Sequence, residues 1–208
     1  MEDLLDYLRR HFLAEPELLA SSGVSLDTLR GWQRAGAAPW PSYRLTQSGE
    51  AASCMGAAAL SAESAWYPQG MLCWLGQALA LDGEPERLRA CFGRQWRAGL
   101  AALELPRAEA EPDWEAAWRD FLAGGYGVCT RAGLPGEIAQ KEALVSLIDA
   151  LTERQSRPAL DPARRERLAW AVTALDGVAA PFAPHERAAS SRARCVELTR
   201  RLYLAEAA

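Results

Sequence analysis

One apolar stripe limits the fold of this chain more than any other feature. Four aliphatic residues recur at the spacing of one helical face: Leu144, Leu147, Ile148 and Leu151. They predict a core-facing helix over residues 135–151, and Pro135 suits its first turn because a backbone N–H has no partner there. Residues 124–129 include three glycines and predict a tight loop, since glycine adopts backbone angles that other residues avoid. We therefore expect a glycine loop that leads into the helix at the hub of the core.

Most of the remaining chain also carries helical patterns, so we predict a mostly α fold, a single-domain bundle of about eight helices. Pro39 and Pro41 force an extended segment, after which residues 43–45 are expected to pair near 65–67 in a small β-hairpin. Residues 48–64 carry no clear pattern. Further helices are predicted over residues 2–13, 16–22, 26–35, 69–81, 85–104, 113–123, 162–176 and 186–204.

We divide the chain into an N-terminal part, residues 1–46, and a helical bundle, residues 47–208, which we expect to pack as one compact unit. Half of the residues are hydrophobic, which is enough for a sizeable core. The last helix of the bundle is expected to bury Cys195, Leu198 and Leu202.

The N-terminal part contains a helix-turn-helix pattern over residues 17–32. Ser25 is a good N-cap for the second helix and Gly36 a good end for it. The pattern resembles the DNA-reading helices of MerR-like and excisionase-like proteins, which implies DNA contact by Arg30 and Arg34, as in a DNA-binding regulator. The alternative is a three-helix scaffold without that activity. Five arginines against six acidic residues in the N-terminal part favour the scaffold, because a DNA-binding module is distinctly basic.

Overall charge and cysteine usage exclude several classes of protein. The net charge of −4 argues against nucleic acid as a partner. No apolar run approaches the roughly 20 residues of a membrane span, and the acidic start does not resemble a signal peptide. Five scattered cysteines without a Cys-x-x-Cys pair favour reduced thiols, and two distant histidines make no local metal motif. We expect a cytoplasmic protein with no metal and no cofactor.

Four residues around the glycine loop are the candidates for chemistry. Lys141 is the only lysine in the chain, and Glu142 follows it. Turned inward beneath Tyr126, either residue would serve as a polar anchor or an acid–base group. The alternative is a solvated pair between Glu137 and Lys141 at the favourable i,i+4 spacing. Cys129 is either an activated thiol or, more commonly, a buried structural cysteine.

The same stretch resembles an uncharacterised family whose members are described as natural product biosynthesis proteins. The resemblance rests on Tyr126-Gly-Val-Cys129, Pro135, Glu137, Ile138, Lys141-Glu142 and Val145. Weaker matches are Tyr7, His11-Phe12, Gly23-Val24, Pro41-Ser42-Tyr43 and Phe182-Ala-Pro184. The family's genes usually stand beside those of secondary-metabolite enzymes, which implies a protein partner from the same biosynthetic cluster.

Two functions are compatible with this resemblance. In the first, the protein is an accessory or binding subunit that supports a partner biosynthetic enzyme. In the second, it is a small enzyme with a pocket lined by Trp and Tyr, in which Glu142, Lys141, Tyr126 and Cys129 act on a small-molecule intermediate. We favour the accessory subunit, because the sequence shows no familiar catalytic constellation.

Overall fold

The computed structural model describes residues 3–53, 56–105 and 113–205, and these are mostly helical, as the sequence predicts. The N-terminal elements follow in the order helix, strand, helix, helix, strand, strand: α1 (Leu4–His11), β1 (Phe12–Ala14), α2 (Glu15–Ser22), α3 (Leu26–Ala35), β2 (Tyr43–Ser53) and β3 (Gly56–Pro68). The helices that follow are α4 (Met71–Ala80), α5 (Pro85–Ala101), α6 (Trp114–Leu122), α7 (Gly125–Cys129), α8 (Pro135–Thr152) and α9 (Pro162–Val178).

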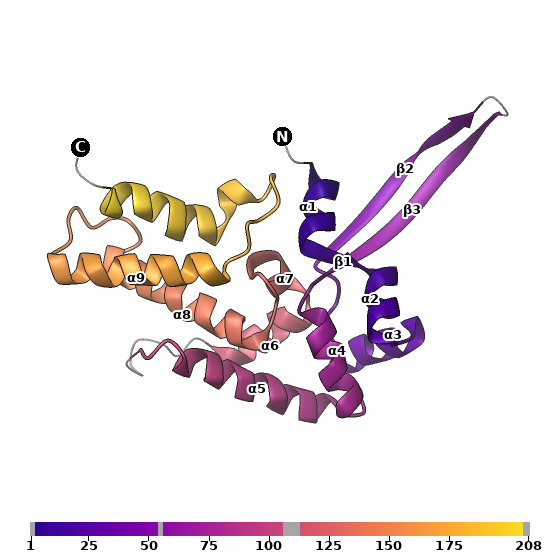
Figure 1. Ribbon diagram of the computed structural model, residues 1–208, viewed down its shortest axis with the longest axis horizontal. Coiled ribbons are helices and arrows are strands. Elements are labelled where there is room, and N and C mark those ends of the chain that lie inside the picture. The colour runs from indigo at the N-terminus through magenta and orange to yellow at the C-terminus, as the bar shows by residue number, and fades with distance from the viewer. Residues whose placement is uncertain (1–2, 54–55, 106–112, 206–208) are drawn as a thin grey trace.

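The three strands form one antiparallel sheet in the order β1-β3-β2. The predicted pairing of residues 43–45 is confirmed. The hairpin is much longer than predicted, because β2 and β3 stay paired out to Ser53 and Gly56 and project from the body as a ribbon (Figure 1). Alanine and glycine are depleted in strands and make up nearly half of residues 48–64, so this stretch gave no strand signal. The predicted boundary after residue 46 falls inside β2.

Helices α2 and α3 are joined by a short turn whose residues have the predicted roles. Gly23 ends α2 with a left-handed φ of 69°. The Ser25 hydroxyl accepts a hydrogen bond from the Thr28 N–H at 3.1 Å and caps α3. Gly36 ends α3, again with a left-handed φ, of 73°. These local signals explain why the sequence located both helices to within a residue or two.

Arg30 is held inside this N-terminal part and does not project as a DNA contact would. Its Nη2 lies 2.6 Å from Oε2 of Glu15. Its Nη1 donates to Oε1 of Gln33 at 2.8 Å and to the Tyr67 hydroxyl at 3.2 Å. The guanidinium therefore ties α3 to α2 and β3. Of the two arginines assigned to DNA from the sequence, only Arg34 is exposed.

Helix α8 crosses the bundle between α5 and α9 and takes part in two cores (Figure 1). Its first half contributes Ile138 and Ala139 to one core. Its second half contributes Leu144, Leu147 and Ile148 to another, shared with α9. The first core is rich in aromatic side chains: Tyr67, Trp74, Phe92, Trp96, Trp118 and Phe121. The prediction that this helix is the hub of the core is confirmed.

The end of the chain is not a regular α-helix. A 3-10 turn, η2 (Arg187–Ala189), precedes two π-helical segments, η3 (Ala193–Leu198) and η4 (Arg200–Leu204). Because the π-helix bonds residues five apart, its inward face recurs at wider spacing than that of an α-helix.

This wider spacing changes which side chains are buried. Cys195, Thr199 and Tyr203 face the core, whereas Leu202 is 53% exposed and Leu198 is half-buried. The predicted burial of Leu202 is therefore wrong, because it assumed the period of an α-helix. The sequence pattern located this segment but did not give its helix type.

Candidate functional site

The four candidate residues line one open cleft of about 330 Å³. Tyr126 and Cys129 come from α7, and Lys141 and Glu142 come from α8. Asp120, from α6, also lines this cleft, and no pattern in the sequence had singled it out. The predicted glycine loop is in fact the short helix α7, so one helical turn brings Tyr126 and Cys129 to the same side.

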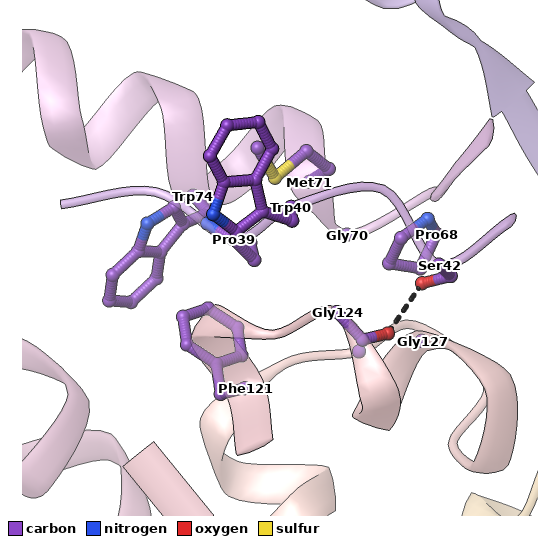
Figure 2. A pocket seen from close by; sticks show the side chains of 11 residues that line it. Pro39, Trp40, Ser42, Pro68, Gly70, Met71, Trp74, Phe121, Gly124 and Gly127 are labelled. Carbon is purple, nitrogen blue, oxygen red and sulfur yellow. Dashed lines mark hydrogen bonds between the residues drawn. The ribbon is translucent and has the colours of Figure 1, made fainter. Parts of the chain in front are cut away.

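The start of α7 is fixed by a close contact with the N-terminal part. Gly124 adopts a left-handed φ of 86°, and a Cβ there would lie 2.5 Å from the carbonyl oxygen of Trp40. The Ser42 hydroxyl donates to the Gly124 carbonyl at 2.8 Å, as Figure 2 shows. A residue other than glycine would therefore force α7 away from the sheet and would move Tyr126.

Figure 2 also shows a second, narrower cavity beside this contact. Its free volume is about 10 Å³, which is room for at most one water molecule. We interpret it as a packing gap between the N-terminal part and the bundle. Its lining residues are Pro39, Trp40, Ser42, Pro68, Gly70, Met71, Trp74, Phe121, Gly124, Gly127 and Gly133.

The connection from α7 to α8 is held by side chain to backbone hydrogen bonds. The Thr130 hydroxyl donates to the Tyr126 carbonyl at 2.7 Å. The Glu137 carboxylate accepts from the Ala132 N–H at 2.7 Å, and burial raises the pKa of this carboxyl above its usual value. Glu137 therefore anchors the loop, and the solvated pair with Lys141 that the sequence allowed is not its role.

Lys141 pairs with its neighbour Glu142. The Lys141 Nζ lies 2.8 Å from Oε1 of Glu142, and the two side chains are only 12% and 27% exposed. The same Nζ lies 5.7 Å from the centroid of the Tyr126 ring, within the range of a cation–π contact. Adjacent helical residues leave the axis about 100° apart, so these two long side chains bend toward each other in the mouth of the cleft.

The protonation states in the cleft follow from burial and from these neighbours. Burial by itself lowers the pKa of Lys141, but the electrostatic influence of the Cys129 side chain and the hydrogen-bonded Glu142 carboxylate outweigh it and hold the pKa above its ordinary value. Burial, reinforced by the Glu142 carboxylate, raises the pKa of the Tyr126 phenol. Burial also raises the pKa of the Cys129 thiol, although the charge of Lys141 opposes this rise.

These directions define what the cleft offers at neutral pH. It presents an ammonium group, a neutral phenol and a neutral thiol around the Glu142 carboxylate, and Asp120 also lines it. A lysine that stays protonated cannot form a Schiff base, and a thiol that stays protonated is a poor nucleophile. The arrangement is therefore built to donate and accept hydrogen bonds. Lys141 suits a carbonyl or carboxylate oxygen of a ligand, and Glu142 suits a donor group.

The cysteines of the described residues form no disulfide bonds with one another. Cys73, Cys91, Cys129 and Cys195 are free, which agrees with the expected reduced thiols. Cys54 lies outside the described residues. Within the described ranges, no three His, Cys, Asp or Glu side chains are grouped in a way that would hold a metal ion.

Comparison with known proteins gives a family match. The model of a family of unknown function (DUF6058) matches residues 88–204, which is more than half of the chain and contains every residue of the cleft. No curated protein and no solved structure matches the chain. In the part of the chain that the structure describes, no helix is both long and apolar enough to cross a membrane.

Proposed function

We propose that the cleft of this chain, which belongs to the family of unknown function DUF6058, binds a small polar intermediate of natural-product biosynthesis. The bound intermediate is presented to a partner enzyme, and the cleft lies within residues 88–204, the part that matches the family. The observation that carries the proposal is the position of Lys141. The only lysine of the chain lies nearly buried in a cleft, against Tyr126 and Glu142. The biosynthetic setting is supported by the resemblance of residues 126–145 to natural product biosynthesis proteins.

A binding role is favoured over covalent catalysis by the charge states in the cleft. Lys141 keeps its proton and Cys129 keeps its thiol hydrogen, so neither is prepared to attack a substrate. A permanent ammonium group beside a carboxylate instead recognises a molecule with both acceptor and donor groups. An accessory subunit needs this recognition and leaves the bond-making step to its partner.

A second candidate function is acid–base catalysis in the same cleft. It is favoured by one observation, namely that the Glu142 carboxylate pairs with Lys141 and lies close enough to the Tyr126 phenol to help raise its pKa. A carboxylate between two proton donors can take a proton from a bound substrate and return it elsewhere. This activity would need no partner protein, and that difference separates the two candidates.

The test uses variants that keep the shape of each side chain. Lys141→Met, Glu142→Gln and Tyr126→Phe would each be co-expressed with the neighbouring biosynthetic genes, and Glu166→Gln on the exposed face of α9 would be the matched control. Product yield, co-purification of the partner and thermal melting would be measured for each protein.

The binding role predicts that Lys141→Met retains the partner and the fold but lowers product yield, whereas Glu166→Gln changes nothing. The catalytic role predicts turnover by the purified protein alone, which Glu142→Gln would lower by about 10²-fold or more. Unchanged melting, partner binding and product yield in all three cleft variants would contradict both roles.

A further inference from the structure

Another cavity, separate from the cleft of Lys141, lies where the N-terminal part meets the family region, residues 88–204. Its free volume is about 190 Å³, which is room for several water molecules or one small anion. One wall comes from α1 and β1, and other walls come from the segments that follow α7 and α9. A ligand in this cavity would therefore touch both parts of the chain. The lining residues are Tyr7, His11, Phe12, Gln69, Gly127, Thr130, Arg131, Ala180 and Pro181.

Backbone hydrogen bonds hold the walls of this cavity in place. The Arg131 N–H donates to the Val178 carbonyl at 3.0 Å, which ties the segment after α7 to the end of α9. The Gly70 N–H donates to the Ala132 carbonyl at 3.1 Å, which ties the same segment to the chain that follows β3. The cavity is therefore formed by the fold itself and needs no ligand to assemble it.

Arg131 brings a positive charge to this cavity. Its Nη2 donates to the Asp176 carbonyl at 3.1 Å, and within the described part of the chain the guanidinium makes no other hydrogen bond. Because a guanidinium carries five N–H donors, most of them remain available to a ligand. The Asp176 carboxylate does not compete for them, since it pairs with Arg192 and Arg200. Glu137 lies close enough to feel the charge of Arg131, but it does not line the cavity.

The lining of this cavity is suited to an anion. Three of its side chains carry N–H donors and come from three segments of the chain: the Arg131 guanidinium, the Gln69 amide and the His11 imidazole. Among the described residues that line the cavity, none is acidic. A carboxylate has two oxygens, which a single arginine can satisfy in a bidentate pair. Donors from three segments instead suit a group with more oxygens, and a phosphate group has them.

We propose that this cavity binds the phosphate group of a small molecule, with Arg131 as the main contact and with Gln69 and His11 beside it. The planar guanidinium matches the geometry of phosphate oxygens and keeps its charge at every physiological pH. None of the described residues lines both this cavity and the cleft of Lys141. The inference is therefore independent of what the cleft binds.

The two histidines of the chain allow a local test of binding. His11 lines the cavity, whereas the side chain of His185 is 59% exposed and lies outside the lining. Inorganic phosphate would be titrated into the full chain at constant pH and ionic strength while NMR follows the ring-proton signals of both histidines. His11→Gln would assign the two signals. We expect the His11 signal to move and saturate while the His185 signal stays in place, and we expect acetate to bind about tenfold more weakly or less.

Variants of the lining identify the groups that hold the phosphate. Arg131→Gln removes the charge but keeps a side chain that can donate to the Asp176 carbonyl, and it should weaken phosphate binding by about tenfold or more. Gln69→Leu removes one donor at nearly the same size and should weaken binding less. Arg165→Gln, exposed near the opposite end of α9, removes the same charge and is the control. Lys141→Met should also leave phosphate binding unchanged, and circular dichroism would check that each variant is folded.

Three results would overturn the proposal. The first is a His11 signal that does not move with phosphate, or that moves no more than the signal of His185. The second is unchanged phosphate binding in folded Arg131→Gln or Gln69→Leu, because the lining would then not hold the ligand. The third is acetate binding as tight as phosphate binding, since the cavity would then recognise a carboxylate.

Discussion

Shortening Leu147 tests whether α8 supports the fold as its burial indicates. Leu147 is 4% exposed and belongs to the core between α8 and α9. Leu147→Ala removes three carbon atoms, which at about 0.8 kcal/mol for each buried carbon is roughly 2.4 kcal/mol of transfer free energy. A cavity left behind adds to this cost, and such substitutions destabilise proteins by about 2–5 kcal/mol in total.

The surroundings place Leu147 toward the lower end of that range. It also lines an open cavity of about 430 Å³, so neighbouring groups and water can occupy part of the space it leaves. Leu144 is fully buried in the same core and does not line this cavity, so Leu144→Ala should cost more. We expect about 2–3 kcal/mol for Leu147→Ala and about 3–5 kcal/mol for Leu144→Ala.

Urea unfolding followed by circular dichroism would measure both values. The midpoint should fall while the slope with urea stays constant, because the surface exposed on unfolding hardly changes. Leu202→Ala, at an exposed position of the last segment, is the control and should change stability by less than about 0.5 kcal/mol. A loss below that value for Leu147→Ala, or a larger loss than for Leu144→Ala, would refute the argument.

Three further predictions concern charge and reactivity. The folded-state pKa values of Lys141 and Tyr126 are raised, so the native protein holds more protons than the unfolded chain in alkali and its stability should fall as pH rises above about 10. Lys141→Met with Tyr126→Phe should flatten that fall in urea titrations. In native alkylation followed by mass spectrometry, exposed Cys73 should react first and Cys195, buried and with its pKa raised to about 11, should react slowly; equal rates would contradict the structure. Gel shifts at low salt should show no saturable DNA binding, and a shift abolished by Arg34→Ala would overturn that expectation.

The sequence predicted those parts of the fold that local chemistry determines. The caps and glycines around α2 and α3 and the apolar stripe of α8 are short-range signals, and the structure agrees with them. The long hairpin was missed because its alanine-rich strands lack the alternation of apolar and polar residues that is typical of a strand. Only the backbone pairing of β2 with β3 in the structure identifies them as strands. Leu202 was misplaced because the sequence pattern does not distinguish a π-helix from an α-helix.

The sequence singled out most residues of the candidate site but did not predict how they are arranged. The sequence singled out Lys141, Glu142, Tyr126 and Cys129, and the structure brings all four to one cleft. The pairing of Lys141 with Glu142 was not foreseen, because helix geometry separates adjacent side chains and only tertiary burial bends these two together. Asp120 was missed because it reaches the cleft from another helix, α6, and is not part of the motif.

The course of α8 through both cores has a consequence for cooperativity. Its helix runs without a break from Ile138, in the aromatic core, to Ile148, in the core shared with α9. Neither core can therefore open without fraying a helix that the other still holds. The amides of α8 should exchange with deuterium only when the whole protein unfolds, and residues of both cores should report the same free energy of opening. The helix thus joins these two cores into one folding unit.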